Sequence, residues 1–222
     1  NRGAAAMHNL IRIFVISFLF FNLSLNANNV YKDNELGVVL LVGDGGYGSG
    51  VIISTSGYIL TNNHVVEGNN NLEAILNYNY YLNEWDEHVH SIEIIKQDKI
   101  RDLALIKINK PKTLLRPIKI SRKIPAIGSQ VHAIGHPDSE FWSYTTGYIS
   151  QIRGDYEWTY KDDEDHVANV YQTQTPIAGG NSGGPLLNNH GNLVGINTFG
   201  DTKNNFQNFS IAVDEIIDFL VN

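Results

Sequence analysis

One serine of the 222-residue chain lies in a setting suited to nucleophilic chemistry. Ser182 stands in the segment Gly179-Gly180-Asn181-Ser182-Gly183-Gly184, where four glycines surround it. A catalytic serine needs an exposed Oγ on a sharply turned backbone, with N–H groups aimed at one point beside it, and glycines permit this geometry. Taken alone, the segment could also be a flexible turn, because glycine-rich loops are common.

Two further residues are of the types that such a serine requires. His64 follows the apolar residues 58–60 and the polar residues 61–63, and histidine is the usual base that activates a serine. Asp102 begins the apolar run 103–108, where a half-buried carboxylate can fix the tautomer of an imidazole. Either residue alone would more often be structural. The chain order His, Asp, Ser is that of chymotrypsin-type proteases rather than of α/β-hydrolases or subtilisins.

The elements that must position these residues are short strands. From residue 36 onward, apolar runs alternate with turn residues, and about a dozen strands at such spacing indicate a sandwich or a barrel. Breaks at 110–113 and 123–125 divide the runs into two halves of similar strand content. The runs are Leu36–Val42, Gly50–Ile53, Tyr58–Thr61, Leu72–Leu76, Ile92–Ile95, Leu103–Ile108, Pro117–Ile120, Gln130–Ile134, Thr146–Ile152, Val170–Thr173, Leu193–Phe199 and Ser210–Val213.

Two segments differ from this strand pattern. One helix is expected near the C-terminus, capped by Asp214 and with Glu215 in its first turn. The segment Gly154–His166 contains the acidic run 162–165, and such a run of like charges predicts a solvated loop.

Composition excludes several classes of function. An apolar fraction of 42% and a charged fraction of 18% are typical of a globular protein. The net charge of -7 and the lack of a long basic run argue against nucleic-acid binding. The absence of cysteine removes cysteine nucleophiles, thiolate metal sites and disulfides. His88 and His90 form a His-x-His pair without an evident third ligand, so a surface strand is favoured over a metal site.

The N-terminal segment reads as an export signal. Arg12 precedes the apolar run 13–21, and Ala27 lies at a plausible cleavage position, so residues 1–27 are expected to be a signal peptide. Residues 1–6 precede Met7 and read as extra leading residues. The mature domain would then be 28–222, secreted or periplasmic, without stable membrane association. An uncleaved membrane anchor is the alternative. Absence of cysteine beside an export signal favours a bacterial source.

Many motifs of the chain occur in the order of one known family. They are GSGVIIS (48–54), GYILTNNHVV (57–66), DLALIKI (102–108), AIGHP (133–137), QTQTPIAGGNSGGPL (172–186), LVGINTFG (193–200) and NFSIAVDEIIDFL (208–220). The chain resembles trypsin-like serine peptidases, most closely the protease domain of the bacterial HtrA (Deg) group. The resemblance implies an all-β fold of two perpendicular six-stranded barrels, about 36–120 and 126–213, with a short C-terminal helix at 214–221. HtrA proteins usually carry a PDZ domain. If the chain is complete at Asn222, this domain is absent, and the oligomeric state is left open.

The resemblance also assigns roles by position. His64 would be the general base, Asp102 would orient it, and Ser182 would be the nucleophile that attacks a peptide carbonyl. The backbone N–H groups of Gly180 and Ser182 would form the oxyanion hole. The substrate would be a polypeptide, and this chemistry needs neither a metal nor an organic cofactor.

A second set of residues would bind the substrate. The side chain of Thr198 would help to hold Asp102, and the backbone from Thr198 through Phe199 to Gly200 would pair with an extended peptide. Pro176, at the pocket-base position, offers no carboxylate for a basic side chain. Pro176, Ile177 and the segment Gln207–Ser210 favour a small or medium apolar P1 residue.

Two asparagines depart from related enzymes. Asn181 replaces the aspartate that pairs with a newly cut N-terminus in digestive trypsins, so activation by zymogen cleavage is not expected. Asn197 stands where glutamyl endopeptidases carry a histidine, which argues against specificity for Glu. Three rival hypotheses are a catalytically silent binding scaffold on the same fold, an esterase, and a membrane-anchored protease with an uncleaved N-terminus.

Overall fold

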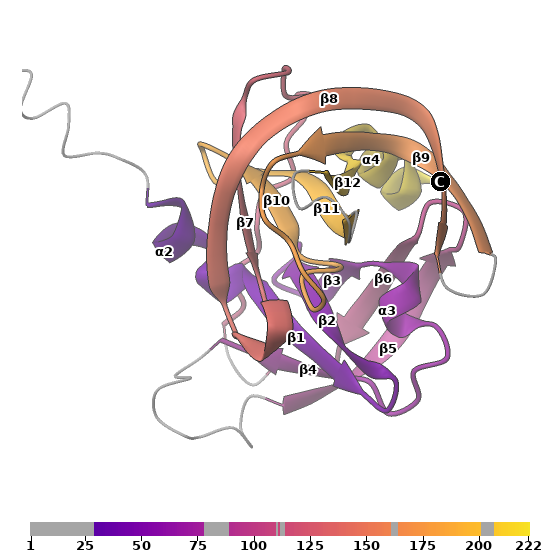
Figure 1. Cartoon of the computed structure of the whole chain (residues 1–222). Helices are drawn as coiled ribbons and strands as arrows, with labels where there is room; N and C mark the ends of the chain where they lie inside the picture. The colour runs from indigo at the N-terminus through magenta and orange to yellow at the C-terminus, as the bar shows by residue number, and fades with distance from the viewer. Residues whose placement is uncertain (1–28, 78–88, 110, 112–113, 161–163, 201–206) are drawn as a thin grey trace, which may run out of the picture.

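The fold consists of two six-stranded β-barrels, as expected from the sequence. The computed structural model describes residues 29–77, 89–109, 111, 114–160, 164–200 and 207–222. The expected signal peptide and His88 lie outside these residues. The first barrel closes in the order β1-β2-β3-β6-β5-β4 and the second in the order β10-β11-β12-β9-β8-β7. Figure 1 shows the first barrel in purple and magenta below the second, in orange and yellow.

Each barrel is built from antiparallel pairs. The strands of the first barrel are β1 (Val38–Gly43), β2 (Gly46–Ile52), β3 (Tyr58–Thr61), β4 (Glu73–Leu76), β5 (Val89–Asp98) and β6 (Leu103–Ile108). Those of the second are β7 (Gln130–Gly135), β8 (Ser143–Tyr160), β9 (Glu164–Thr173), β10 (Pro185–Asn188), β11 (Leu193–Gly200) and β12 (Asn208–Ala212).

Alternation along the strands separates the barrel interiors from the layer between the barrels. In β1, Val39 and Leu41 point into the core of the first barrel. Val38 and Leu40 instead join a cluster that includes Ile134 of the second barrel. Both faces of β1 are buried, because successive side chains point to opposite faces of a strand. The two barrels therefore pack through an apolar layer to which both contribute residues.

Two expectations about strands were wrong, and one strand was missed. The segment Gly154–His166 is not a loop, because residues 154–160 extend β8 and 164–166 begin β9; residues 161–163 lie outside the described part. The segment 117–120 forms only an isolated bridge, from Ile120 to Leu193. Strand β10, in turn, was not expected. Figure 1 shows β8 and β9 as long curved strands of the second barrel, with the end of β8 and the start of β9 on the side of β5 and β6.

The helices are short. They are α2 (Val30–Asn34), α3 (Asn63–Val66) and α4 (Val213–Val221), with 3₁₀ turns at Glu35–Gly37 and Pro137–Ser139. Helix α4 was expected, but its N-cap is Ala212 rather than Asp214. Asp214 and Glu215 lie in its first turn, where the helix dipole favours negative charge. Val213, Ile216 and Phe219 bury one face of α4 against the barrels.

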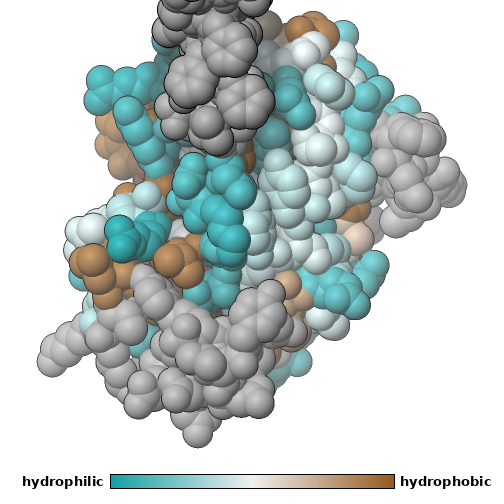
Figure 2. All heavy atoms as spheres, turned by 90° about the vertical axis from the view of Figure 1, so that its left-hand side faces the viewer, coloured by the Kyte–Doolittle hydropathy of each residue, from teal (hydrophilic) through white to brown (hydrophobic). Residues whose placement is uncertain are grey.

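The outer surface is mixed in polarity. Figure 2 looks at the side that carries α2 and shows mainly hydrophilic and weakly polar side chains, with hydrophobic ones in small separate groups. The helices within the described residues include none with the length and apolar character needed to cross a membrane.

Candidate active site

Asp102 lies in the tight turn that leads into β6. Its φ of 55° is left-handed, a conformation that costs most residues about 1 kcal/mol but that Asp tolerates better. Its side chain is 1% exposed, so the carboxylate must be held by hydrogen bonds. The Asn62 side chain donates to the Asp102 backbone carbonyl at 2.9 Å and fixes this turn against the end of β3.

His64 lies on α3, directly beside this carboxylate. Its Nδ1 is 2.8 Å from Asp102 Oδ2 and 3.0 Å from Oδ1, and its backbone N–H donates to Oδ1 at 2.9 Å. An ionised carboxylate only accepts, so the proton of a neutral ring lies on Nδ1. The lone pair of that ring is then on Nε2, the atom that can take a proton.

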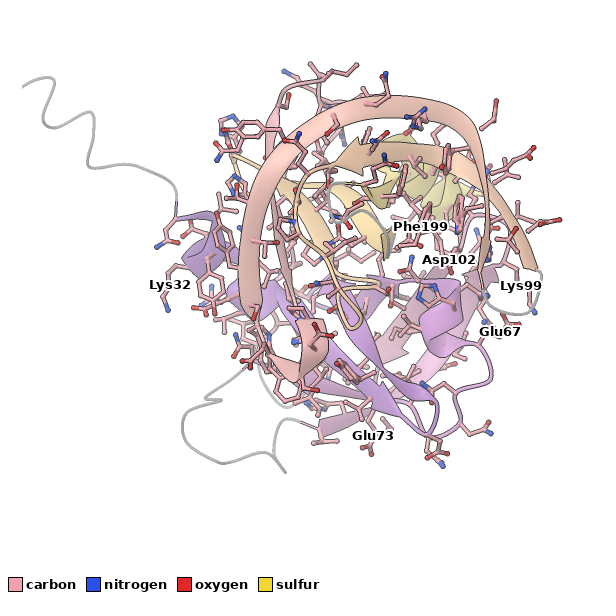
Figure 3. All side chains as sticks on the ribbon, viewed as in Figure 1. Lys32, Glu67, Glu73, Lys99, Asp102 and Phe199 are labelled. Carbon is pink, nitrogen blue, oxygen red and sulfur yellow. The ribbon has the colours of Figure 1, made fainter. Side chains whose placement is uncertain are left out.

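Thr198 joins the two barrels at this point. Its hydroxyl donates to Asp102 Oδ2 at 2.7 Å, and its backbone carbonyl accepts from Ser182 Oγ at 2.9 Å. A series of hydrogen bonds therefore runs from His64 through Asp102 and Thr198 to Ser182. The structure thus brings the three residues of the predicted triad into one polar cluster with Thr198. The first barrel contributes His64 and Asp102, and the second contributes the other two residues. Figure 3 shows Asp102 beside Phe199, the neighbour of Thr198, where the barrels meet.

The glycine-rich segment is a tight turn and is held from several sides. Gly180 and Gly183 have φ of +99° and +83°, which glycine adopts without strain. The Ser182 carbonyl accepts from Ser49 N–H at 2.8 Å, and Gly183 N–H donates to the Asn197 carbonyl at 2.9 Å. Within the described residues, the backbone hydrogen bonds do not engage the N–H groups of Gly180 and Ser182.

The peptide groups on either side of Gly180 are fixed by their carbonyls. The Gly179 carbonyl accepts from Asp138 N–H at 2.9 Å, and the Gly180 carbonyl accepts from Ser49 Oγ at 2.7 Å. In a trans peptide the N–H points away from the carbonyl, so the Gly179–Gly180 amide directs its N–H away from Asp138. Ser49 lies in the motif at 48–54, but its contact with Gly180 was not predicted, because 131 residues separate the two.

The residues expected to bind substrate lie on two neighbouring segments. Phe199 and Gly200 pair with Phe209 and Asn208 of β12, whereas β10 pairs with β11 only as far as Ile196. Among the described strands, none pairs with the other edge of β11 over residues 198–200. An extended peptide could therefore add along that edge.

The second of these segments contains Pro176 and Ile177. Pro176 is exposed and its carbonyl accepts from Thr145 Oγ1 at 2.9 Å, whereas Ile177 is half-buried. Asn208 is buried and donates from Nδ2 to the Thr175 carbonyl at 2.9 Å. Its Oδ1 lies close to the position that a Cβ on Gly200 would take. The Asn208 side chain therefore occupies the space between segment 175–177 and the end of β11.

Metal binding finds no support in the described part of the chain. No group of three or more His, Asp or Glu side chains there could hold a metal ion. His90 lies in β5 opposite Ala74 and is buried, so the expectation of a surface position was wrong for this residue. Its neighbour in the His-x-His pair lies outside the described residues.

The comparisons with known proteins agree with this architecture. A trypsin-like peptidase domain matches residues 48–196, and the chain belongs to this family. More narrowly, its relatives are Deg proteases. Serine endoprotease DegS of Escherichia coli is 34% identical over 186 residues, which cover 83% of this chain and 46% of DegS. Protease Do-like 1, a chloroplast protein of Arabidopsis thaliana, is 35% identical over 79% of this chain and 39% of its own length.

Solved structures extend the likeness to three dimensions. A serine endoprotease from Yersinia pestis has a TM-score of 0.70 at 28% identity, covering 88% of this chain and 65% of that one. The active form of a protease from M. tuberculosis has a TM-score of 0.75 at 21% identity, covering 89% and 85%, and supports the fold alone. The chain spans roughly half or less of DegS and Do-like 1, the curated relatives described above.

Proposed function

We propose that this domain is a serine endopeptidase that hydrolyses peptide bonds through an acyl-enzyme. The observation that carries the proposal is the series of hydrogen bonds from His64 through Asp102 and Thr198 to Ser182. Ser182 is the nucleophile, His64 is the general base, and Asp102 holds the imidazole in the tautomer that accepts a proton on Nε2. The proton then passes from His64 to the leaving amine.

The serine hydroxyl must change its partner before it reacts. A hydroxyl has a single proton, so donation to the Thr198 carbonyl and donation to His64 exclude each other. In the proposed mechanism, rotation about the Cα–Cβ bond of Ser182 redirects the proton; side-chain rotamers interconvert on a fast timescale. Binding of the substrate along β11 competes for the same carbonyl and favours this rotation.

The N–H groups of Gly180 and Ser182 form the oxyanion hole in this proposal. Neither donates a backbone hydrogen bond in the described residues, and the carbonyls of the same two peptide groups, those of Gly179 and Asn181, accept from the N–H groups of Asp138 and Gly184 at 2.9 Å each. The donors are therefore oriented before the reaction and cost little reorganisation when the tetrahedral oxyanion forms.

The substrate is an extended polypeptide that adds as a strand to residues 198–200. Recognition of the main chain accepts many sequences, so selectivity depends on the pocket for the P1 side chain. The buried side chain of Asn208 restricts that pocket, and Ile177 supplies an apolar wall. We therefore propose a small or medium apolar P1 residue.

The setting of the domain is proposed from the sequence and from relatives. Residues 1–27 serve as an export signal, and the domain 28–222 acts in the periplasm or outside the cell. Relatives named as probable periplasmic serine endoproteases, such as the one from Chlamydia trachomatis at 36% identity, support this location.

The test is cleavage of casein by purified residues 28–222, with and without a serine-directed phosphonate. Cleavage should disappear in Ser182→Ala and with the phosphonate, and should persist in Ser56→Ala, a change at an exposed turn serine. Product sequencing then gives the P1 residue.

Other outcomes point to the rival functions. Hydrolysis of a nitrophenyl ester without cleavage of casein would replace the peptidase by an esterase. Absence of any hydrolysis together with absence of phosphonate labelling at Ser182 would favour a binding scaffold and refute the proposal.

A further inference from the structure

The turn that carries Asp102 is held by a residue to which neither sequence motif nor family assigns a role. Arg101 precedes Asp102 and belongs to the turn 98–102 that links β5 to β6. Within the turn, its backbone N–H donates to Asp98 Oδ1 at 3.0 Å, and its guanidinium donates to Asp98 Oδ2 at 2.7 Å. The side chain of Asp98 thus closes the turn on both the backbone and the side chain of Arg101.

The same guanidinium reaches helix α4, more than 110 residues further along the chain. Its Nε donates to Glu215 Oε2 at 2.7 Å, and a terminal nitrogen donates to Asp218 Oδ2 at 2.5 Å. Glu215 and Asp218 are three residues apart and so lie on one face of α4. Three edges of one planar group are therefore occupied by three carboxylates. The bonds to Asp98, first, and to Glu215 raise the pKa of Arg101, although partial burial opposes them.

Helix α4 is itself anchored at both ends. Glu215 Oε1 accepts from the backbone N–H of Asn169 in β9 at 2.8 Å, and the Asn169 side chain donates to Asp214 at 2.7 Å. At the other end of α4, Lys96 Nζ donates to the Phe219 carbonyl at 2.6 Å. Helix α4 is therefore a fixed support, tied both to β9 of its own barrel and to β5 of the first barrel.

The turn also contacts β9 directly. Val167 N–H donates to the Ile100 carbonyl at 2.9 Å, and His166 Nδ1 is 2.7 Å from the Lys99 carbonyl. These contacts hold the outer part of the turn, at the place where Figure 3 shows Lys99 below the end of the β8–β9 hairpin. Arg101 is the residue of this turn whose side chain connects it to α4.

We propose that Arg101 is a positioning residue of the active site, which acts with Asp98, Glu215 and Asp218 to set the orientation of the Asp102 carboxylate. We call these four residues the Arg101 clamp. The inference rests on the proposed peptidase function. Asp102 has a left-handed φ and needs support from its neighbours, and the clamp fixes the residue directly before it. A planar guanidinium can hold three carboxylates in one geometry, whereas a lysine ammonium is a single point charge.

The test compares Arg101→Gln and Arg101→Lys with the control Arg153→Gln. Arg153 is an exposed cation on β8 whose guanidinium contacts Gln172. We expect kcat to fall about 10- to 100-fold in both Arg101 variants, with KM within about twofold, because small misplacements of catalytic groups cost this much. The control should retain the kcat of the wild type. Glu215→Gln, which removes one of the three carboxylates bound by Arg101, should also lower kcat.

A second readout separates positioning from simple loss of stability. The low-field proton resonance of His64 Nδ1–H reports the hydrogen bond to Asp102, and it can be recorded on protein that is folded by circular dichroism. It should shift or broaden in Arg101→Gln and stay unchanged in Arg153→Gln. If Arg101→Gln only lowers the urea midpoint, while kcat of the folded protein and the resonance stay as in wild type, the proposal is wrong.

The same measurement keeps the two proposals distinguishable. A wild-type domain that neither cleaves casein nor reacts with the phosphonate would refute the peptidase function. The His64 resonance would still report on Arg101, because it depends on the geometry of His64 and Asp102 and requires no turnover. An unchanged resonance in Arg101→Gln would then overturn the positioning role on its own.

Discussion

His136 makes the stability of this domain depend on pH. The residue follows β7, is 0% exposed, and packs edge-on against the Trp142 ring at 4.7 Å between centroids. Its Nδ1 accepts from the Trp142 backbone N–H at 3.1 Å, so the neutral ring carries its proton on Nε2. A second proton would have to displace this hydrogen bond. Burial lowers the pKa of His136 from 6.5 to about 4, against a smaller opposing effect of the Val39 backbone.

The size and sign of the effect follow from this pKa. The drop from 6.5 to about 4 corresponds to about 3 kcal/mol. Between these pH values the unfolded chain binds a proton at this histidine and the folded chain does not. The stability is therefore complete above pH 6.5 and is lost as the pH falls, with a slope of about 1.4 kcal/mol per pH unit. Below about pH 4 the loss is complete.

The assay is urea unfolding between pH 4 and 8 for wild type, His136→Asn and the exposed control His190→Asn. Asparagine keeps an acceptor near the position of Nδ1 but does not titrate. The variant should be less stable at pH 8, because a smaller side chain leaves a cavity, and it should lose about 3 kcal/mol less than wild type on acidification. The control should follow the wild-type slope.

One result would refute this reasoning. If His136→Asn and wild type lose stability in parallel from pH 7 to pH 4, His136 is not the group whose protonation destabilises the fold. The backbone carbonyl of His136 also lies against Gly180, so the same protonation should reduce the rate of phosphonate labelling reversibly in acid. A labelling rate that declines in acid to the same extent in His136→Asn would place the effect elsewhere.

Two further changes test the proposed site. Thr198→Val keeps the shape of the side chain but removes the donor to Asp102 Oδ2. A hydrogen bond to a charged group is worth about 1.5–3 kcal/mol, so the free energy of unfolding should fall by that amount. The value of kcat should fall as well. Equal kcat values for Thr198→Val and wild type would mean that this bond does not support catalysis. Asn208→Gly removes the side chain beside Gly200 and should shift the P1 preference in casein digests toward larger apolar residues. The control Asn109→Gly, at an exposed asparagine of the first barrel, should leave the P1 preference unchanged. An unchanged P1 profile would show that Asn208 does not limit the pocket.

Much of the strand pattern could be predicted because alternation is local. The apolar run at Leu103–Ile108 is β6 with the same bounds, and the fold class is confirmed. The β8–β9 hairpin could not be predicted, because its like charges resemble a solvated loop. Its extension is stabilised by aromatic stacking. Trp158 stacks at 5.2 Å on His166 of the paired strand and at 5.1 Å on Phe199 of β11, which is distant in sequence. Tertiary packing here overrides the local preference.

The candidate site shows the same division between local and distant information. Ser182, His64 and Asp102 could be picked from residue type and order, since glycines beside a serine and a carboxylate before an apolar run have local meaning. The roles assigned to them remain predictions. Ser49 and Arg101 have no such signal, because they act on Gly180 and α4 through contacts that only the folded chain creates.

The chemistry proposed for this site depends on how the two barrels dock as well as on the residues of the proposed triad. His64 and Asp102 come from the first barrel, whereas Ser182 and Thr198 come from the second. Ser49 of β2 binds the Ser182 carbonyl through its N–H and the Gly180 carbonyl through its hydroxyl, so one residue of the first barrel holds two peptides of the nucleophile turn. Conversely, α4, which follows the last strand of the second barrel, holds the turn of Asp102 in the first barrel through the Arg101 clamp. Each barrel thus supports the segment of the other that carries proposed catalytic residues, so a small rotation between the barrels should misplace both halves of the proposed triad before either barrel unfolds.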